Sequence, residues 1–276
     1  MTINDSRNQA SAATTVEAGE APVLYEDHDD IAVIRLNRPH RLNAVTPELV
    51  DELGAALERA TADAPAVCVL RGEGRAFCAG HDLKDDRPAI SPEEERHRLQ
   101  HLQDVTRKIR QAPFPVIAAV HGYALGAGCE FALCSDLIVA TRSARFGFPE
   151  VSVGLGITGG ISHVLPLAVS LAKAKELVLL GEHIDAATAA QLGLINWVVD
   201  DDRLDEKVTE LTRQLRQRPR LAMSLAKMAL DRGAESGIDA AYQTEVSNSL
   251  TLFGTEDAAD ASAAFRRRSE ERAGRR

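Results

Sequence analysis

Apolar residues recur along this chain in two patterns that alternate. Short apolar runs, bounded by Gly, Pro or charged turns, predict strands; they cover residues 23–25, 31–36, 66–70, 116–120, 137–140 and 195–199. Between these runs the apolar spacing is helical and several starts carry capping residues; helices are expected over residues 46–60, 91–111, 127–134, 161–180 and 185–193. This alternation of strands and helices predicts an α/β core.

The pattern changes after residue 200, where only helices are expected, over residues 203–217, 220–232 and 238–252. The first of these carries an apolar stripe that needs a covering surface. The start of the chain is polar and lacks the apolar core of a signal peptide, which favours a flexible tail. We therefore predict three parts: a tail at 1–21, an α/β core at 22–200, and a C-terminal helical region with oligomer contacts at 201–276.

Composition narrows the functional class. The formal charge of -9 argues against nucleic acid as the main partner, and no segment approaches the length of a membrane span. The four cysteines form no Cys-x-x-Cys pair, so buried reduced thiols in a reducing cytoplasm are expected, and a metal site is not.

Residues 115–150 hold the candidate chemistry. A buried strand runs into Gly122, Gly126 and Gly128, which permit tight turns and close approach to a ligand. If a helix begins near Ala127, its free amides point outward at the positive end of the helix dipole. Such an amide can stabilise an oxyanion that forms on a substrate carbonyl.

Two carboxylates accompany these amides. Glu130 lies three residues after Ala127, on the same helical face, and a carboxylate in a first helical turn tends to stay ionised, as a general base must. Glu150 follows Pro149 on a loop. The glycine spacing alone is most often only a turn, and a lone Glu near a helix start is usually solvated. The combination is what favours a catalytic site.

Several motifs together resemble the enoyl-CoA hydratase/isomerase (crotonase) superfamily, over residues 23–265. They are Asn37-Arg38-Pro39 with Asn43-Ala44, Phe77-Cys78-Ala79-Gly80-His81-Asp82-Leu83, the stretch from Pro115 to Glu130, Phe148-Pro149-Glu150, and Ala186 to Leu194. The resemblance implies a crotonase-like spiral of strand–helix units followed by a C-terminal helical region.

The resemblance also implies roles for individual residues. The backbone amides of His81 and Ala127 would form the oxyanion hole, and Glu130 and Glu150 would be the catalytic carboxylates. Residues expected to contact CoA or substrate are Arg41, Leu42, Ala79, His81, Asp82, Leu83, Lys84, Gly126 and Ala127. Ala127 stands where the family usually has Gly, so the hole requires a negative φ there. His81 is bulkier than the usual Ala, and the loop at 154–160 lacks the usual Pro-Gly turn.

The expected reaction is the reversible syn addition of water to a 2-enoyl-CoA, which gives a 3-hydroxyacyl-CoA and belongs to fatty acid metabolism. Glu130 would deprotonate the water and Glu150 would protonate the α carbon. No metal or cofactor is expected, because coenzyme A is part of the substrate. The resemblance implies a homotrimer or a dimer of trimers in the cytoplasm, with no nucleic acid or membrane partner.

Other functions stay open at this point. The same scaffold supports a double-bond isomerase, a hydratase-lyase, a decarboxylase or a thioester hydrolase. A non-catalytic acyl-CoA binder is a further alternative, although both glutamates speak against it. The spacing of the glycines at 122–128 does not fit a dinucleotide-binding enzyme, and no Gly-x-Ser-x-Gly indicates a serine hydrolase.

Overall fold

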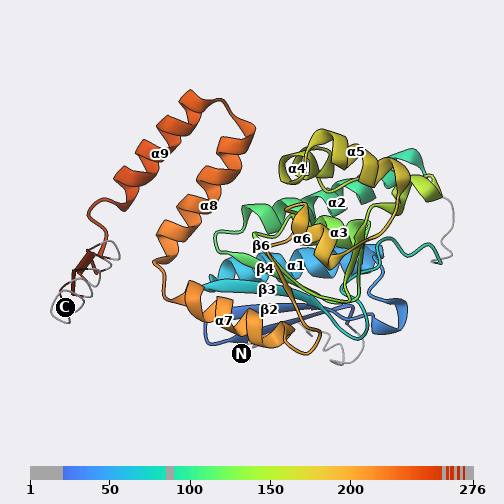
Figure 1. Ribbon diagram of the computed structural model, residues 1–276, viewed down its shortest axis with the longest axis horizontal. Helices are drawn as coiled ribbons and strands as arrows, with labels where there is room; N and C mark the ends of the chain where they lie inside the picture. The colour runs from blue at the N-terminus through green and yellow to red at the C-terminus, as the bar shows by residue number, and fades with distance from the viewer. Residues whose placement is uncertain are drawn as a thin grey trace, which may run out of the picture.

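The computed structural model (Figure 1) describes residues 21–84, 90–256, 259, 260, 262, 263, 266, 267 and 270. The predicted tail lies almost wholly outside these residues, as does much of the chain after 256. One sheet has the strand order β1-β2-β3-β4-β6-β9 and a smaller one the order β5-β7-β8. The strands are β1 (Val23–His28), β2 (Ile31–Leu36), β3 (Val67–Gly72), β4 (Val116–Val120), β5 (Tyr123–Leu125), β6 (Leu137–Thr141), β7 (Arg145–Gly147), β8 (Ile184–Asp185) and β9 (Trp197–Val199).

The helices follow the predicted order. They are α1 (Pro47–Asp63), α2 (Pro92–Gln111), α3 (Ala127–Leu133), α4 (Ile161–Ala168), α5 (Leu171–Leu180), α6 (Ala186–Gln191), α7 (Leu204–Arg216), α8 (Arg220–Glu235) and α9 (Ile238–Leu252), with 3-10 turns η1 (Pro39–Arg41) and η2 (Pro149–Val153). The capping signals act as expected: the Thr46 hydroxyl accepts a hydrogen bond from the amide of Leu49, and Ser91 forms a capping box with Glu94.

The large sheet is covered on both faces. Along β3, Cys68 and Leu70 belong to the main core with α1, α2 and α3, while Val67 and Val69 pack in a second cluster with α7. Residues along β3 alternate between the two clusters because successive side chains of a strand point to opposite faces of the sheet. Except for the antiparallel β1–β2 pair, neighbouring strands of this sheet run parallel, so the carboxyl ends of β3 and β4 open toward the same edge.

One prediction about local structure was wrong, and three short strands were missed. The single helix expected over residues 161–180 is two helices, α4 and α5, because Ser170 between them has a φ of 142°, which a helix does not allow. The Ser170 hydroxyl then caps α5 by accepting from the amide of Lys173. The strands β5, β7 and β8 were not predicted, because segments of two or three residues are too short to show a period.

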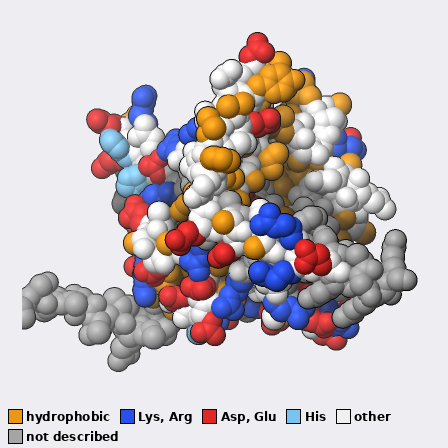
Figure 2. All heavy atoms as spheres, turned by 90° about the vertical axis from the view of Figure 1, so that its left-hand side faces the viewer, with side chains coloured by type: hydrophobic (Ala, Val, Ile, Leu, Met, Phe, Trp, Pro, Cys, Tyr) orange, Lys and Arg blue, Asp and Glu red, His pale blue; other side chains and the backbone are white. Residues whose placement is uncertain are grey.

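Helices α8 and α9 project from the α/β body as a pair (Figure 1) and have no buried residue in the described chain. Figure 2, which views the molecule from their side, shows hydrophobic side chains grouped on the upper part of this face. The large exposed apolar residues of the pair are Leu221, Leu230, Ile238, Tyr242, Val246 and Leu250. Within the described residues, no helix combines the length and the apolar character that crossing a membrane requires.

Candidate active site

Two glycine-containing segments lie side by side where β3 and β4 end. The amide of Leu125 donates to the carbonyl of Cys78 at 3.0 Å. A Cβ on Gly80, whose φ is +86°, would stand only 2.7 Å from the carbonyl oxygen of Leu125, so this approach requires glycine. The segments therefore bring the backbones of His81 and Ala127 close to each other, as the predicted oxyanion hole needs.

Ala127 is the first residue of α3, after the N-cap residue Gly126. Its amide has no carbonyl one turn earlier in the helix to pair with, so it points outward at the positive end of the dipole. The φ angle of Ala127 is not positive, as an alanine at this position requires. The position that requires glycine for lack of space is the next one. A Cβ on Gly128 would stand 2.2 Å from the carbonyl oxygen of Cys78.

Glu130 lies on α3 and is almost fully buried, with 1% of its surface exposed. Its Oε1 accepts hydrogen bonds from the backbone amide of Thr158 at 2.8 Å, and the Thr158 hydroxyl lies 2.7 Å from Oε2 and 2.9 Å from Oε1. Burial raises the pKa of Glu130, and the Thr158 hydrogen bonds offset only part of that rise. The helix start alone suggested a carboxylate that stays ionised easily, but desolvation is the larger effect.

Glu150 lies on η2 and is also buried, with 8% of its surface exposed. Within the described residues neither carboxylate oxygen has a hydrogen-bond partner from another residue. Burial, with a smaller contribution from the charge of Glu130, raises the pKa of Glu150 to about 7. A Cβ on Gly126 would stand 3.0 Å from Oε1 of Glu150, so this acid reaches the corner where α3 begins.

Asp82 is the centre of a charged cluster beside the predicted oxyanion hole. Arg41 donates to it through Nη2 at 2.9 Å and Nε at 3.2 Å, and Arg38 donates through two nitrogens at 3.2 Å. Burial raises the pKa of Asp82, but the hydrogen bonds from Arg41, the Lys84 amide and Arg38 together lower it below its usual value. The guanidinium of Arg41, which was expected to contact CoA or substrate, thus forms an ion pair with a carboxylate.

The other residues predicted to contact substrate follow the same backbone path. Ala79 donates its amide to the carbonyl of Leu42 at 3.0 Å, which places these two residues together. Leu83, with 65% of its surface exposed, and the exposed Lys84 lie at the surface just before residues 85–89. Arg38 was noted only as part of the motif Asn37-Arg38-Pro39 and was given no role, and Thr158 was not singled out, because a lone Thr in a glycine-rich loop shows no pattern.

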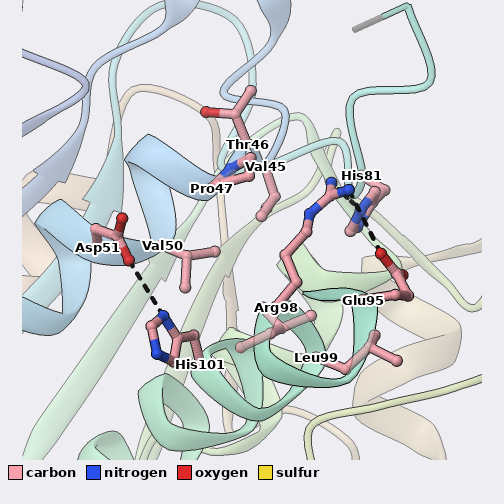
Figure 3. Close-up of a pocket in the computed structure, with 11 residues that line it drawn as sticks. Val45, Thr46, Pro47, Val50, Asp51, His81, Glu95, Arg98, Leu99 and His101 are labelled. Atoms are coloured by element: carbon pink, nitrogen blue, oxygen red, sulfur yellow. Dashed lines mark hydrogen bonds and ion pairs between the residues drawn. The ribbon is translucent and has the colours of Figure 1, made fainter. Parts of the chain in front are cut away.

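The side chain of His81 faces a cavity of about 70 Å³ between α1 and α2 (Figure 3). Its Nε2 lies 3.3 Å from Nη2 of Arg98, and Nη1 of the same arginine lies 3.6 Å from Oε2 of Glu95. On the far side of the cavity His101 lies 3.4 Å from Asp51. The ring of His81 therefore contacts α2 while its backbone lies at the glycine corner.

Comparisons with known proteins agree with this architecture. A family model described as enoyl-CoA hydratase/isomerase matches residues 26–272. The chain is 34% identical to the short-chain-enoyl-CoA hydratase of Clostridium acetobutylicum, over 88% of this chain and 94% of that protein. It is 33% identical to the 1,2-epoxyphenylacetyl-CoA isomerase of Escherichia coli, over 81% and 87%. A crystal structure of a putative enoyl-CoA hydratase from Streptomyces coelicolor superposes with a TM-score of 0.86 at 33% identity, covering 95% of this chain and 97% of that one, which confirms the predicted fold class.

Proposed function

The chain belongs to the enoyl-CoA hydratase/isomerase family, and from that premise we propose that it adds water reversibly to short 2-enoyl-CoA thioesters. One observation carries the proposal: two buried carboxylates, Glu130 and Glu150, converge on the corner where α3 presents its first amide. Addition of water to a double bond needs a base for the water and an acid for the α carbon, and two such carboxyl groups supply both.

The mechanism that we propose uses the backbone as well as the acids. The amides of His81 and Ala127 donate to the thioester oxygen and stabilise the enolate that develops on it, each contributing about 3 kcal/mol to lowering the barrier. Glu130 removes a proton from water, whose hydroxide adds to C3. Glu150 gives its proton to C2 on the same face. A pKa of about 7 suits Glu150 to this role, because the acid is then available near neutral pH.

Isomerisation of an acyl-CoA is the second candidate, because one relative is named as an isomerase. A proton shuttle along the acyl chain can run through a single carboxylate. The burial of both glutamates at one corner favours hydration, since a second buried acid that the reaction does not use would only destabilise the fold. The two reactions differ in mass, because hydration adds one water and isomerisation adds nothing.

The wider setting is also a proposal. We expect a cytoplasmic homotrimer or dimer of trimers acting in fatty acid metabolism. The exposed apolar residues of α8 and α9 support the expectation of an oligomer, because a second copy would cover them. We expect no cofactor apart from the coenzyme A of the substrate. In the described ranges, His, Cys, Asp and Glu side chains form no cluster of three that could hold a metal ion.

The direct test mixes the protein with crotonyl-CoA and follows the loss of the enoyl-thioester absorbance, with the product identified by mass. We expect the product to be heavier by one water. In Glu130→Gln and in Glu150→Gln we expect the rate to fall by about 100-fold or more. Glu52→Gln, at an exposed position on α1, is the matched control and should keep full activity. Unchanged hydration in both active-site variants would refute the proposed roles of the two acids.

A further inference from the structure

The hydroxyl of Thr158 makes a contact that neither the family resemblance nor the sequence pattern assigns. Its Oγ1 lies within hydrogen-bond distance of both oxygens of Glu130, at 2.7 and 2.9 Å, while the backbone amide of the same residue donates to Oε1 at 2.8 Å. A hydroxyl carries one proton, so it donates to one oxygen at a time. Within the described residues the Glu130 carboxylate thus accepts two hydrogen bonds, and both come from Thr158.

The backbone fixes Thr158 in this position. The following residue, Gly159, has a φ of +62°, and a Cβ there would stand 2.9 Å from the Cβ and Oε2 of Glu130. The thiol of Cys134, one helical turn after Glu130, contacts the carbonyl of Gly159 at 3.5 Å. Glu130 on α3 and Cys134 just after the end of this helix therefore both contact the loop. By contrast, a Cβ on Gly156, two residues before Thr158, would meet nothing within 4 Å.

Other charged groups near Glu130 do not supply what Thr158 supplies. Glu150 on η2 carries the other buried carboxyl group of the site, and the charge of Glu130 raises the pKa of Glu150. The thiols of Cys78, Cys129 and Cys134 are buried, which raises the pKa of each thiol and leaves them uncharged. Within the described residues, no charged side chain of α2 or α4 shifts the pKa of Glu130. Among the described residues, it is the hydrogen bonds from Thr158 that favour the ionised form of Glu130.

We infer that the Thr158 hydroxyl is a positioning group that keeps the Glu130 carboxylate fixed and ionised, so that the single proton of the carboxyl pair resides on Glu150. Two buried acids that share a site do not ionise together readily, and the one with hydrogen-bond donors retains the charge. Glu130 has these donors and Glu150 has none from another described residue. The inference rests on the proposed function, because it assigns base and acid within the hydration reaction.

The test compares Thr158→Val, which removes the hydroxyl but keeps the shape and the backbone amide, with Thr158→Ser, which restores a hydroxyl. Thr61→Val, at an exposed position on α1, is the matched control. The rate of crotonyl-CoA hydration is measured between pH 5 and 9. We expect the acidic limb of kcat/KM to move to higher pH by about one unit in Thr158→Val, because the ionised base has lost one hydrogen bond. We also expect kcat to fall about tenfold with little change in KM, and the Ser variant to match the wild type.

A profile of Thr158→Val that superimposes on that of the wild type would overturn the inference. An equal loss in the Ser and Val variants with an unshifted limb would also overturn it, because the residue would then only support the loop. A titration of ¹³C-labelled glutamates by NMR, assigned with Glu130→Gln and Glu150→Gln, follows ionisation without turnover. A wild type that hydrates nothing would refute the proposed function, whereas identical titrations of Glu130 in the wild type and Thr158→Val would refute the inference alone.

Discussion

Replacing Glu150 by Gln should stabilise the folded protein in alkaline solution while it slows hydration by about 100-fold or more. The wild-type carboxylate is buried and has no hydrogen-bond donor from another described residue, so the folded state favours its neutral form. Gln has nearly the same shape and is neutral at every pH. The substitution therefore removes a charge that the fold tolerates poorly and leaves the packing in place.

The size and sign of the effect follow from the pKa of Glu150, which rises from 4.5 to about 7 on folding. Between these two pH values the folded state binds more protons than the unfolded state, so its stability falls as the pH rises. One pH unit corresponds to about 1.4 kcal/mol, so the loss approaches an upper limit of about 3 kcal/mol above pH 7. Below pH 4.5 both states are protonated and the group contributes nothing to the pH dependence.

Urea unfolding at pH 5 and pH 8, at one protein concentration, measures this difference. We expect Glu150→Gln to be more stable than the wild type by about 2 kcal/mol at pH 8, and to differ from it much less at pH 5. Glu52→Gln, at an exposed position, should leave the free energy of unfolding unchanged at both values. A Glu150→Gln variant that is no more stable than the wild type at pH 8 would show that the carboxylate is solvated or paired, and the argument from its burial would be wrong.

Two further predictions concern the frame around the acids. Gly126→Ala should lower the hydration rate about 100-fold, because its Cβ would stand 3.0 Å from Oε1 of Glu150 at a φ of +52°, whereas Gly156→Ala, where a Cβ meets nothing, should keep the rate. A normal rate in the first variant would mean that Glu150 does not need its observed position. Asp82→Asn should lower the free energy of unfolding by roughly 3 kcal/mol in urea titrations, because it leaves two arginines without a buried partner. Asp205→Asn breaks an exposed ion pair and should change the same quantity by less than about 1 kcal/mol, so equal effects would contradict this account.

The sequence predicted those features that repeat or that carry a strong local signal. Apolar runs located each strand of the large sheet, and capping residues such as Thr46 and Ser91 located the starts of α1 and α2. The glycines at 122–128 were predicted to permit tight turns and close approach to a ligand, and the contact between Gly80 and Leu125, which only glycine permits, was found in the structure. The division of the chain at residues 21 and 200 and the roles of the site residues stay predictions.

Features that depend on contacts between distant segments could not be predicted in this way. The strands β7 and β8 exist because Arg145 pairs with Asp185 and Phe146 with Ile184 across the fold, and neither segment shows a period of its own. The partner of Arg41 was missed for a similar reason. Its guanidinium and Asp82 lie 41 positions apart, and a basic residue beside a predicted CoA site gives no sign that a buried acid engages it.

The two buried acids explain why Thr158 matters for stability as well as for catalysis. A buried carboxyl group without donors destabilises the fold when it is ionised, and a second one nearby adds repulsion. Within the described residues Glu130 has hydrogen-bond donors and Glu150 has none from another residue. In the mechanism that we propose, Glu150 is the acid that delivers the proton, so it is the one left without donors. If both acids lacked donors, the site would hold a proton on either one, and base and acid would not be distinguished. In the mechanism that we propose, the difference in hydrogen bonding between Glu130 and Glu150 is therefore what sets the direction of proton transfer.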